Sequence, residues 1–220
     1  AHIAHAKLPQ HRTATVEAFI KGLAKTQKFP ASVLLPLVLN PVFEPSLLKQ
    51  MASNEMLGPM MRAMLHNTAT PTVLSAGQKT NVVPSEATGE VDGRLLPGQR
   101  PEDLVAELKP YLGDKVEVEF LTTSQPCEVD YDTPLYELFE QVLGEFDPGC
   151  ATVPFLITGS TDGRYLATRG VKVYGFAPLQ QEGGGPSLWE MVHGHNERLS
   201  VKNLAFGTRV LYEVVRRFCT

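Results

Sequence analysis

The 220 residues include 20 basic and 24 acidic side chains, a net charge of -4, and 43% of them are hydrophobic. This length and composition allow one large domain or two small ones with an ordinary core. The chain has no basic runs, so no nucleic-acid partner is expected, whereas an anionic substrate is not excluded.

The cysteines and the apolar stretches indicate the redox compartment of the protein and whether it spans a membrane. Cys127, Cys150 and Cys219 lie far apart without a CxxC pair, which favours reduced thiols in a cytoplasmic protein over a disulfide framework or a thiolate zinc site. The most apolar stretch, Ser32 to Phe43, is too short to span a bilayer, so no membrane partner is expected. The chain opens with AHIAHAKLP, which predicts no signal peptide and a start inside a domain.

Helical patterns dominate the first third of the chain. Apolar residues recur at helical spacing in Thr13–Thr26, which predicts a helix. From Ala31 to His66 the sequence is apolar, rich in methionine and interrupted by prolines. Such a composition predicts short helices separated by turns.

From Thr70 the pattern changes to β-branched runs separated by glycine and proline. These runs predict strands at Thr72–Ser75 and Ala87–Leu95, and the alternating VEVEFL predicts a third at Val116–Leu121. Between them, Pro101–Tyr111 is an amphipathic helix that opens with acidic residues. Together these elements predict an α+β layer.

The polar stretch Thr122–Pro134 is the predicted domain boundary. Beyond it strands alternate with helices, which predicts an α/β layer whose thin sheet is incomplete by itself. The expected elements are a helix at Pro134–Phe146, a strand at Val153–Thr158, a short helix from Asp162, a strand at Val171–Phe176, a long loop, and a final helix at Val201–Phe218.

The motif VHGHNERLS precedes the last helix and places two histidines beside a glycine. Neutral imidazole is a common zinc ligand, and its second nitrogen needs a partner that Asn196 or Glu197 could supply. Against this, His193 and His195 do not make a zinc site by themselves, and from this motif alone a solvated loop is the favoured interpretation.

Two further motifs point to substrate binding. ITGSTDGRYL ends a predicted strand in GST before an acid at a helix start, a place where substrates commonly bind; the alternative is a helix cap from Ser160 or Thr161. NVVPSEA and VDGRLLPG carry Asn81 and Arg94, which could face one carboxylate if their strands pair; the alternative is an arginine that points to solvent.

The order AHAKLP, NVVPSEA, VDGRLLPG, TGSTDGRY, HGHNER and a closing helix resembles the aminoacylase, glutamate carboxypeptidase and succinyl-diaminopimelate desuccinylase family of co-catalytic zinc hydrolases. The resemblance covers nearly the whole chain. It implies a zinc domain interrupted by an α+β sandwich lid that also makes a homodimer. Residues 1–122 then correspond to most of the lid, with a helical insert at 31–66 similar to that of carboxypeptidases acting on acyl-amino acids. Residues 123–220 correspond to the C-terminal α/β part of the zinc domain.

The resemblance also implies roles for single residues. His193 matches the last ligand of a site for two zincs, which cobalt or manganese could replace, and His5 matches the histidine that stabilises the oxyanion. The substrate-binding positions that it implies are Asn81 and Arg94 for the carboxylate end, and Gly159, Thr161 and Asp162 for the turn of the zinc domain.

Some features depart from the family pattern. Lys7 stands where serine is common, and His195 stands where the family has another residue. The chain contains no HxD and no Glu-Glu pair, the motifs that supply the family's other ligands and its general base. The sequence therefore predicts part of a zinc-dependent hydrolase, inactive alone, that cleaves a peptide or N-acyl amide bond next to a free carboxylate. The alternative is a non-catalytic dimerisation module that lacks the metal site.

Overall fold

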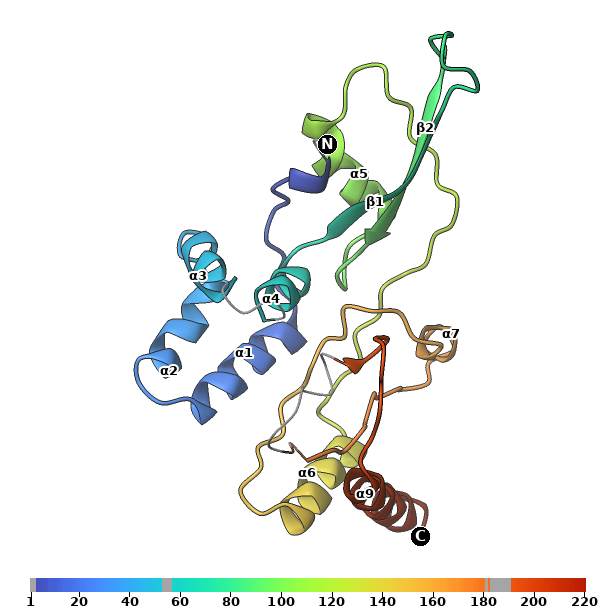
Figure 1. The fold of residues 1–220 in the computed structure, drawn as a ribbon. Coiled ribbons are helices and arrows are strands. Elements are labelled where there is room, and N and C mark those ends of the chain that lie inside the picture. Colours follow the sequence, from blue (N-terminus) through green and yellow to red (C-terminus); the bar gives the residue numbers. More distant parts are fainter. Residues whose placement is uncertain (1–2, 53–56, 181, 183–190) are drawn as a thin grey trace.

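The computed structural model describes residues 3–52, 57–180, 182 and 191–220. Figure 1 shows three groups of elements: the helices of the insert with α1, a hairpin with α5, and the pair α6 and α9. Helices and a small antiparallel sheet share the chain, which confirms the mixed α/β and α+β class. Residues 181 and 183–190 of the long loop predicted after Phe176 lie outside the described residues.

The first group packs α1 (Ala14–Thr26) against the short helices of the insert. Thr13 begins α1, because its hydroxyl accepts a hydrogen bond from the Val16 amide at 3.3 Å. The insert consists of α2 (Ala31–Leu34), the 3-10 helix η2 (Leu35–Leu39), α3 (Glu44–Met51) and α4 (Leu57–Leu65). This confirms the predicted series of short helices. The fully buried side chains at their centre are Val16, Ile20, Val38, Met61, Met64 and Leu65.

The second group is the hairpin of β1 (Thr68–Ala76) and β2 (Ala87–Arg94) with α5 (Pro101–Leu108) and the 3-10 helix η3 (Lys109–Tyr111). The strands pair antiparallel from Thr68 opposite Arg94 to Ala76 opposite Ala87. The register shifts between Pro71 and Val73, since proline has no amide hydrogen for the ladder. Short 3-10 helix η1 (Ile3–His5) lies at the start of the chain, and the segment that follows it packs on α5.

The third group is the contact of α6 (Pro134–Phe146) with α9 (Val201–Cys219). Val142 and Val210 are fully buried there, and Phe139 stacks on Phe176 with ring centroids 4.0 Å apart. Arg217 bridges the two helices through two hydrogen bonds to the Glu145 carboxylate, at 2.8 and 2.6 Å. The predicted helices at both ends of this region are confirmed.

Three predicted strands are wrong as secondary structure. Val116–Leu121, Val153–Thr158 and Val171–Phe176 are extended without strand pairing. An isolated strand leaves its amides and carbonyls without partners, so it needs a neighbour. The part of the chain that the structure describes supplies no such neighbour, and Phe120 remains 51% exposed. The alternation is present, but the pairing that would turn it into a sheet is not.

Packing contacts cross the predicted boundary near Thr122. Phe155 lies edge-on against Phe19 of α1, with ring centroids 5.4 Å apart. A Cβ on Gly22 would come within 2.6 Å of Val153 Cγ1, so glycine is required for this close approach. The segment 153–156 thereby packs against the helices of the insert.

No helix within the described ranges is long and apolar enough to cross a membrane.

The ion pairs of α9 give a pH-dependent stability. Hydrogen bonds from Arg216 and Arg217 lower the pKa of Glu213 from its ordinary value of 4.5 to about 2. A depressed folded-state pKa means that the carboxylate stabilises the fold above pH 4.5 and loses this contribution as the pH falls toward 2. We therefore expect the difference in melting temperature between the wild type and Glu213→Gln to be largest above pH 4.5 and to shrink toward pH 2.

The control for this measurement is Glu86→Gln, because Glu86 is exposed and has no ion pair among the residues described. Its melting temperature should follow the wild type at every pH. A difference for Glu213→Gln that does not change between pH 6 and pH 2.5 would contradict the role of the two arginines. Circular dichroism measures both series.

Candidate functional site

Arg94 lies at the base of the hairpin, where β2 ends opposite the start of β1. Its Nε donates to Asp92 Oδ2 at 2.9 Å, because residues two apart on a strand point to the same face. Its Nη1 donates to the carbonyl of Thr158 at 3.0 Å. The guanidinium thus joins the end of β2 to the start of the GST turn, and the Arg94 side chain remains 56% exposed.

The turn after Thr158 leads into the short helix α7 (Gly163–Ala167). The Thr161 hydroxyl accepts the Gly163 amide at 3.1 Å in the turn before the helix, and Asp162, the N-cap residue, makes no side-chain cap bond. The Ser160 hydroxyl accepts from Arg164 at 2.6 Å. Gly159, Thr161 and Asp162 are all at or near the surface. The structure therefore brings Arg94 together with this predicted substrate-binding turn.

Asn81 lies at the opposite end of the hairpin, in the turn between β1 and β2. Seven residue steps separate the two ends of the ladder, which is roughly 23 Å at about 3.3 Å per residue. Figure 1 shows the hairpin extending away from α7. Asn81 and Arg94 of one chain therefore do not meet at one carboxylate.

His5 ends the 3-10 helix η1 and is exposed. The residues after it are held by the Tyr111 hydroxyl, which donates to the Lys7 carbonyl and accepts from the Lys7 amide, both at 3.0 Å. Ala6 and Leu8 are buried against Leu104 and Leu108 of α5. His5 is thus a side chain at the surface of an anchored segment.

His193 and His195 are exposed in the loop before α9. His193 has φ of 59°, a left-handed conformation that is uncommon for residues other than glycine. Its amide donates to Glu197 Oε2 at 3.2 Å. Glu197 therefore binds the main chain of His193, whereas the predicted role was to orient the ring. Across the described segments, no hydrogen bond joins this loop to the turn at Thr161.

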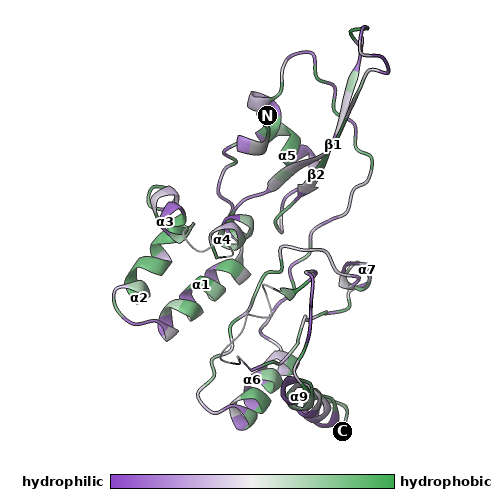
Figure 2. Ribbon diagram, in the orientation of Figure 1, coloured by the Kyte–Doolittle hydropathy of each residue, from purple (hydrophilic) through white to green (hydrophobic). Residues whose placement is uncertain are grey.

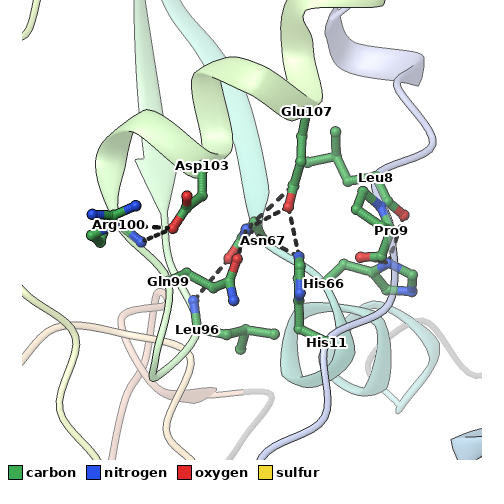
Figure 3. Close-up of polar contacts among 10 residues, drawn as sticks. All are labelled: Leu8, Pro9, His11, His66, Asn67, Leu96, Gln99, Arg100, Asp103 and Glu107. Atoms are coloured by element: carbon green, nitrogen blue, oxygen red, sulfur yellow. Dashed lines mark hydrogen bonds and ion pairs between the residues drawn. The ribbon is translucent and has the colours of Figure 1, made fainter.

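A buried polar junction connects the insert, the hairpin and α5 (Figure 3). Asn67, which is 2% exposed, accepts the Leu96 amide at 2.9 Å and donates to both oxygens of Glu107 at 3.1 and 3.2 Å. Glu107 Oε1 also lies 2.6 Å from His11 Nε2. These hydrogen bonds pair the buried amide and carboxylate groups of the junction. Leaving such groups without partners would be costly for stability.

A second buried pair lies on the insert side of this junction. His66 Nε2 bonds the Glu44 carboxylate, and its Nδ1 donates to the carbonyl of Leu8 at 2.8 Å. Sequence reasoning missed both clusters. The only signal for them is the polar dipeptide His66–Asn67 between an apolar helix and a strand, and that dipeptide does not indicate its distant partners.

An acidic cavity of about 730 Å³ lies between the start of α1 and the start of α6. Five carboxylates line it, together with Tyr131 and Tyr136. Burial, followed by the charge of Glu140, raises the pKa of Tyr136 to about 12. Clustered carboxylates repel an anion, so this cavity does not suit a substrate carboxylate. The lining acids are Glu128, Asp130, Asp132, Glu137 and Glu140.

The side chains that can bind a metal here are those of His, Cys, Asp and Glu. Within the described ranges no three His, Cys, Asp or Glu side chains come together as metal ligands, whereas zinc sites need three or four. The described residues thus do not hold a metal by themselves. His193 offers a single ligand position at most.

Comparison with known proteins assigns the chain to a class. Residues 8–217 match Peptidase family M20/M25/M40, and the chain belongs to this family. The match confirms the resemblance to zinc amidohydrolases and metallopeptidases drawn from the motifs. No solved structure matches the chain significantly.

Several individual proteins are similar to the chain at low identity. The chain is 28% identical over 208 residues to the human N-fatty-acyl-amino acid synthase/hydrolase PM20D1, covering 92% of this chain and 39% of that protein. It is 30% identical over 149 residues to the Xenopus tropicalis PM20D1, covering 66% and 28%. It is 25% identical over 165 residues to the probable carboxypeptidase S-like 2 of Dictyostelium discoideum, covering 74% and 30%. The chain thus spans well under half the length of these relatives.

Asn67→Ala should destabilise the fold. The substitution leaves the Leu96 amide and part of Glu107 without partners, and each unsatisfied buried group costs about 1–3 kcal/mol. We expect a lower midpoint of urea unfolding with an unchanged slope. Asn81→Ala is the matched control, because Asn81 is an exposed asparagine in a turn; a change within about 0.5 kcal/mol is expected there. Equal losses for the two variants would refute the importance of the junction.

Proposed function

We propose that this chain is part of a hydrolase that cleaves a peptide or N-acyl amide bond next to a free carboxylate. The observation that carries the proposal is the position of Arg94 beside the GST turn, with a 3.0 Å bond to Thr158. Membership of the M20/M25/M40 peptidases supports the amide-hydrolase class. The names of the human and Dictyostelium relatives support acyl-amino acids or peptides as substrates.

Arg94 is suited to bind the substrate carboxylate. Its Nε and Nη1 are used by Asp92 and Thr158, while its Nη2 has no hydrogen bond among the described residues. A guanidinium stays charged and binds carboxylates through paired N–H groups. The two existing bonds fix its position, so it can receive a carboxylate without reorganising. In this proposal Gly159, Thr161 and Asp162 line the adjoining surface.

The position of Asn81 bears on assembly. Because one hairpin separates Asn81 from Arg94, both can contact the same substrate only if they come from different copies of the chain. We therefore propose a homodimer through the lid, in which the hairpin tip of one copy approaches the site of the other. The exposed His5 is assigned the role of stabilising the oxyanion in this assembly.

A metal is proposed for the complete protein. M20 relatives are generally metal-dependent hydrolases, and we assign His193 one ligand position in a site for two zincs, with cobalt or manganese as alternatives. The described residues do not form this site by themselves. We also propose a cytoplasmic location, which the three free and exposed cysteines support.

The second candidate function is a non-catalytic dimerisation module. The observation that favours it is that the described residues contain no cluster of metal ligands. The two candidates differ in what they predict: a dimerisation module forms dimers without binding zinc or acyl-amino acids. Light scattering combined with zinc analysis separates them.

In the complete protein, Arg94→Ala should lower kcat/KM for an N-acyl amino acid about 10- to 100-fold, the range expected for a lost hydrogen bond to a charged group. The same change should hardly affect the matching substrate whose carboxylate is replaced by a carboxamide. Arg100→Ala is the control, since Arg100 is also exposed and paired with a nearby acid. Calorimetric binding, measured in parallel, makes the test independent of turnover. Equal losses on both substrates would exclude the carboxylate role.

His193→Ala should remove one zinc ion per chain from the metal-loaded protein, because a ligand imidazole is lost. His195→Ala is the matched control, two residues away in the same loop and equally exposed. Metal content is measured by mass spectrometry after purification in zinc. If His193→Ala retains all the zinc, the proposed ligand is wrong; loss with His195→Ala alone would assign the ligand to His195.

A further inference from the structure

The insert exposes a cluster of large apolar side chains that the proposed reaction does not use. They lie before and along α2 and η2 and in the turn that leads to α3. Phe29 is 83% exposed and Val42 is 77% exposed. We call this cluster the insert patch; it consists of Phe29, Val33, Leu34, Leu37, Val42 and Phe43.

The sequence of this segment explains the patch. The 15 residues from Phe29 to Phe43 include no charged side chain. Val38 and Leu39 turn into the core, whereas Phe29, Val33 and Leu37, spaced four residues apart, are exposed. Single exposed apolar residues are ordinary, but several large ones on one short segment are typical of an interaction site.

Lysines outnumber acids around the patch. Residues 17–52 contain four lysines and two acids, Glu17 and Glu44. Glu44 is buried and bonded to His66, so its charge is not presented at this surface, and Glu17 forms an ion pair with Lys21 at 3.1 Å. Lys25 on α1 and Lys28 beside Phe29 are exposed. In a chain of net charge -4, this is a local basic rim on an apolar surface.

Figure 2 shows the same arrangement along the ribbon, with hydrophobic green over α2 and hydrophilic purple in the loop that joins it to α1. An apolar face with lysines at its edge is the composition that binds the interface of an anionic bilayer. The expectation of no membrane partner rests on the length needed to span a bilayer, and a surface contact needs no such length. We propose that the insert patch docks on an anionic phospholipid surface, with its apolar side chains in the headgroup boundary and Lys25 and Lys28 near the phosphates.

A second copy of the chain fits the patch less well. A symmetric dimer brings the same surface of both copies together, so the lysine rims of the two copies would face each other. Like charges across an interface are unfavourable. An anionic surface instead neutralises them. The inference concerns the insert alone and does not depend on the role of Arg94.

The test is flotation of the protein with vesicles of phosphatidylcholine alone and of phosphatidylcholine with one quarter phosphatidylserine. We expect binding to the anionic vesicles that weakens on raising the salt to 0.5 M, because salt screens exposed charges. Lys25→Gln with Lys28→Gln should reduce the partition coefficient about 25-fold, since each lysine near the surface contributes about fivefold. Val33→Ser with Val42→Ser should reduce it by about tenfold or more.

Matched controls come from other exposed surfaces. Val82→Ser with Val83→Ser alters two exposed valines at the hairpin tip, and Lys109→Gln with Lys115→Gln alters two exposed lysines; neither should change apolar insertion at the insert. Circular dichroism checks that all variants are folded. Three results would overturn the proposal: no flotation with anionic vesicles, equal loss in the insert and control variants, or a light-scattering change from dimer to monomer in the valine variant of the insert.

Discussion

The buried amide of Asn67 is the interaction on which the arrangement of the insert, the hairpin and α5 depends. It accepts the Leu96 amide and donates to Glu107, so it joins the end of the insert to the chain beyond β2 and to α5. Asn67 directly precedes Thr68, and Thr68 pairs with Arg94 at the base of the hairpin. The position from which Arg94 reaches Thr158 is therefore fixed by a polar group that has no access to water. A buried N–H cannot exchange its protein partner for solvent, which makes such a junction specific.

The helices were predictable because their determinants are local. Thr133 accepts the Tyr136 amide, and Pro134 occupies the first helical position, so α6 begins where the sequence places its cap. The strands were different. VEVEFL has the alternation of a strand, but alternation does not supply the neighbour that a strand must pair with. The hairpin β1–β2 forms since its two strands follow each other along the chain, and pairing between more distant segments is not encoded in any one of them.

At the candidate site too, local features were predictable and long-range contacts were not. Sequence motifs correctly placed Arg94 at the end of a strand and Asp162 at a helix start. They did not indicate that Arg94 bonds the carbonyl 64 residues away, nor that Asn81 lies in the turn at the far end of the hairpin. His193 was expected to have its ring oriented by a neighbour, yet Glu197 takes its main-chain amide instead. That bond fits the left-handed backbone of His193, a conformation that residue spacing does not reveal.

Acidic and basic side chains gather in different parts of the chain, which the net charge does not show. Five carboxylates gather at the cavity between α1 and α6, while the rim of the insert carries lysines and the base of the hairpin carries Arg94. Electrostatic focusing acts over several ångströms around such clusters. In the proposed function, the cavity would repel a substrate carboxylate, and the guanidinium held between Asp92 and Thr158 would bind it. Because Asp92 uses only Nε, it orients Arg94 while leaving Nη2 for an incoming anion, so in this proposal the pairing acid positions the arginine for binding instead of occupying it.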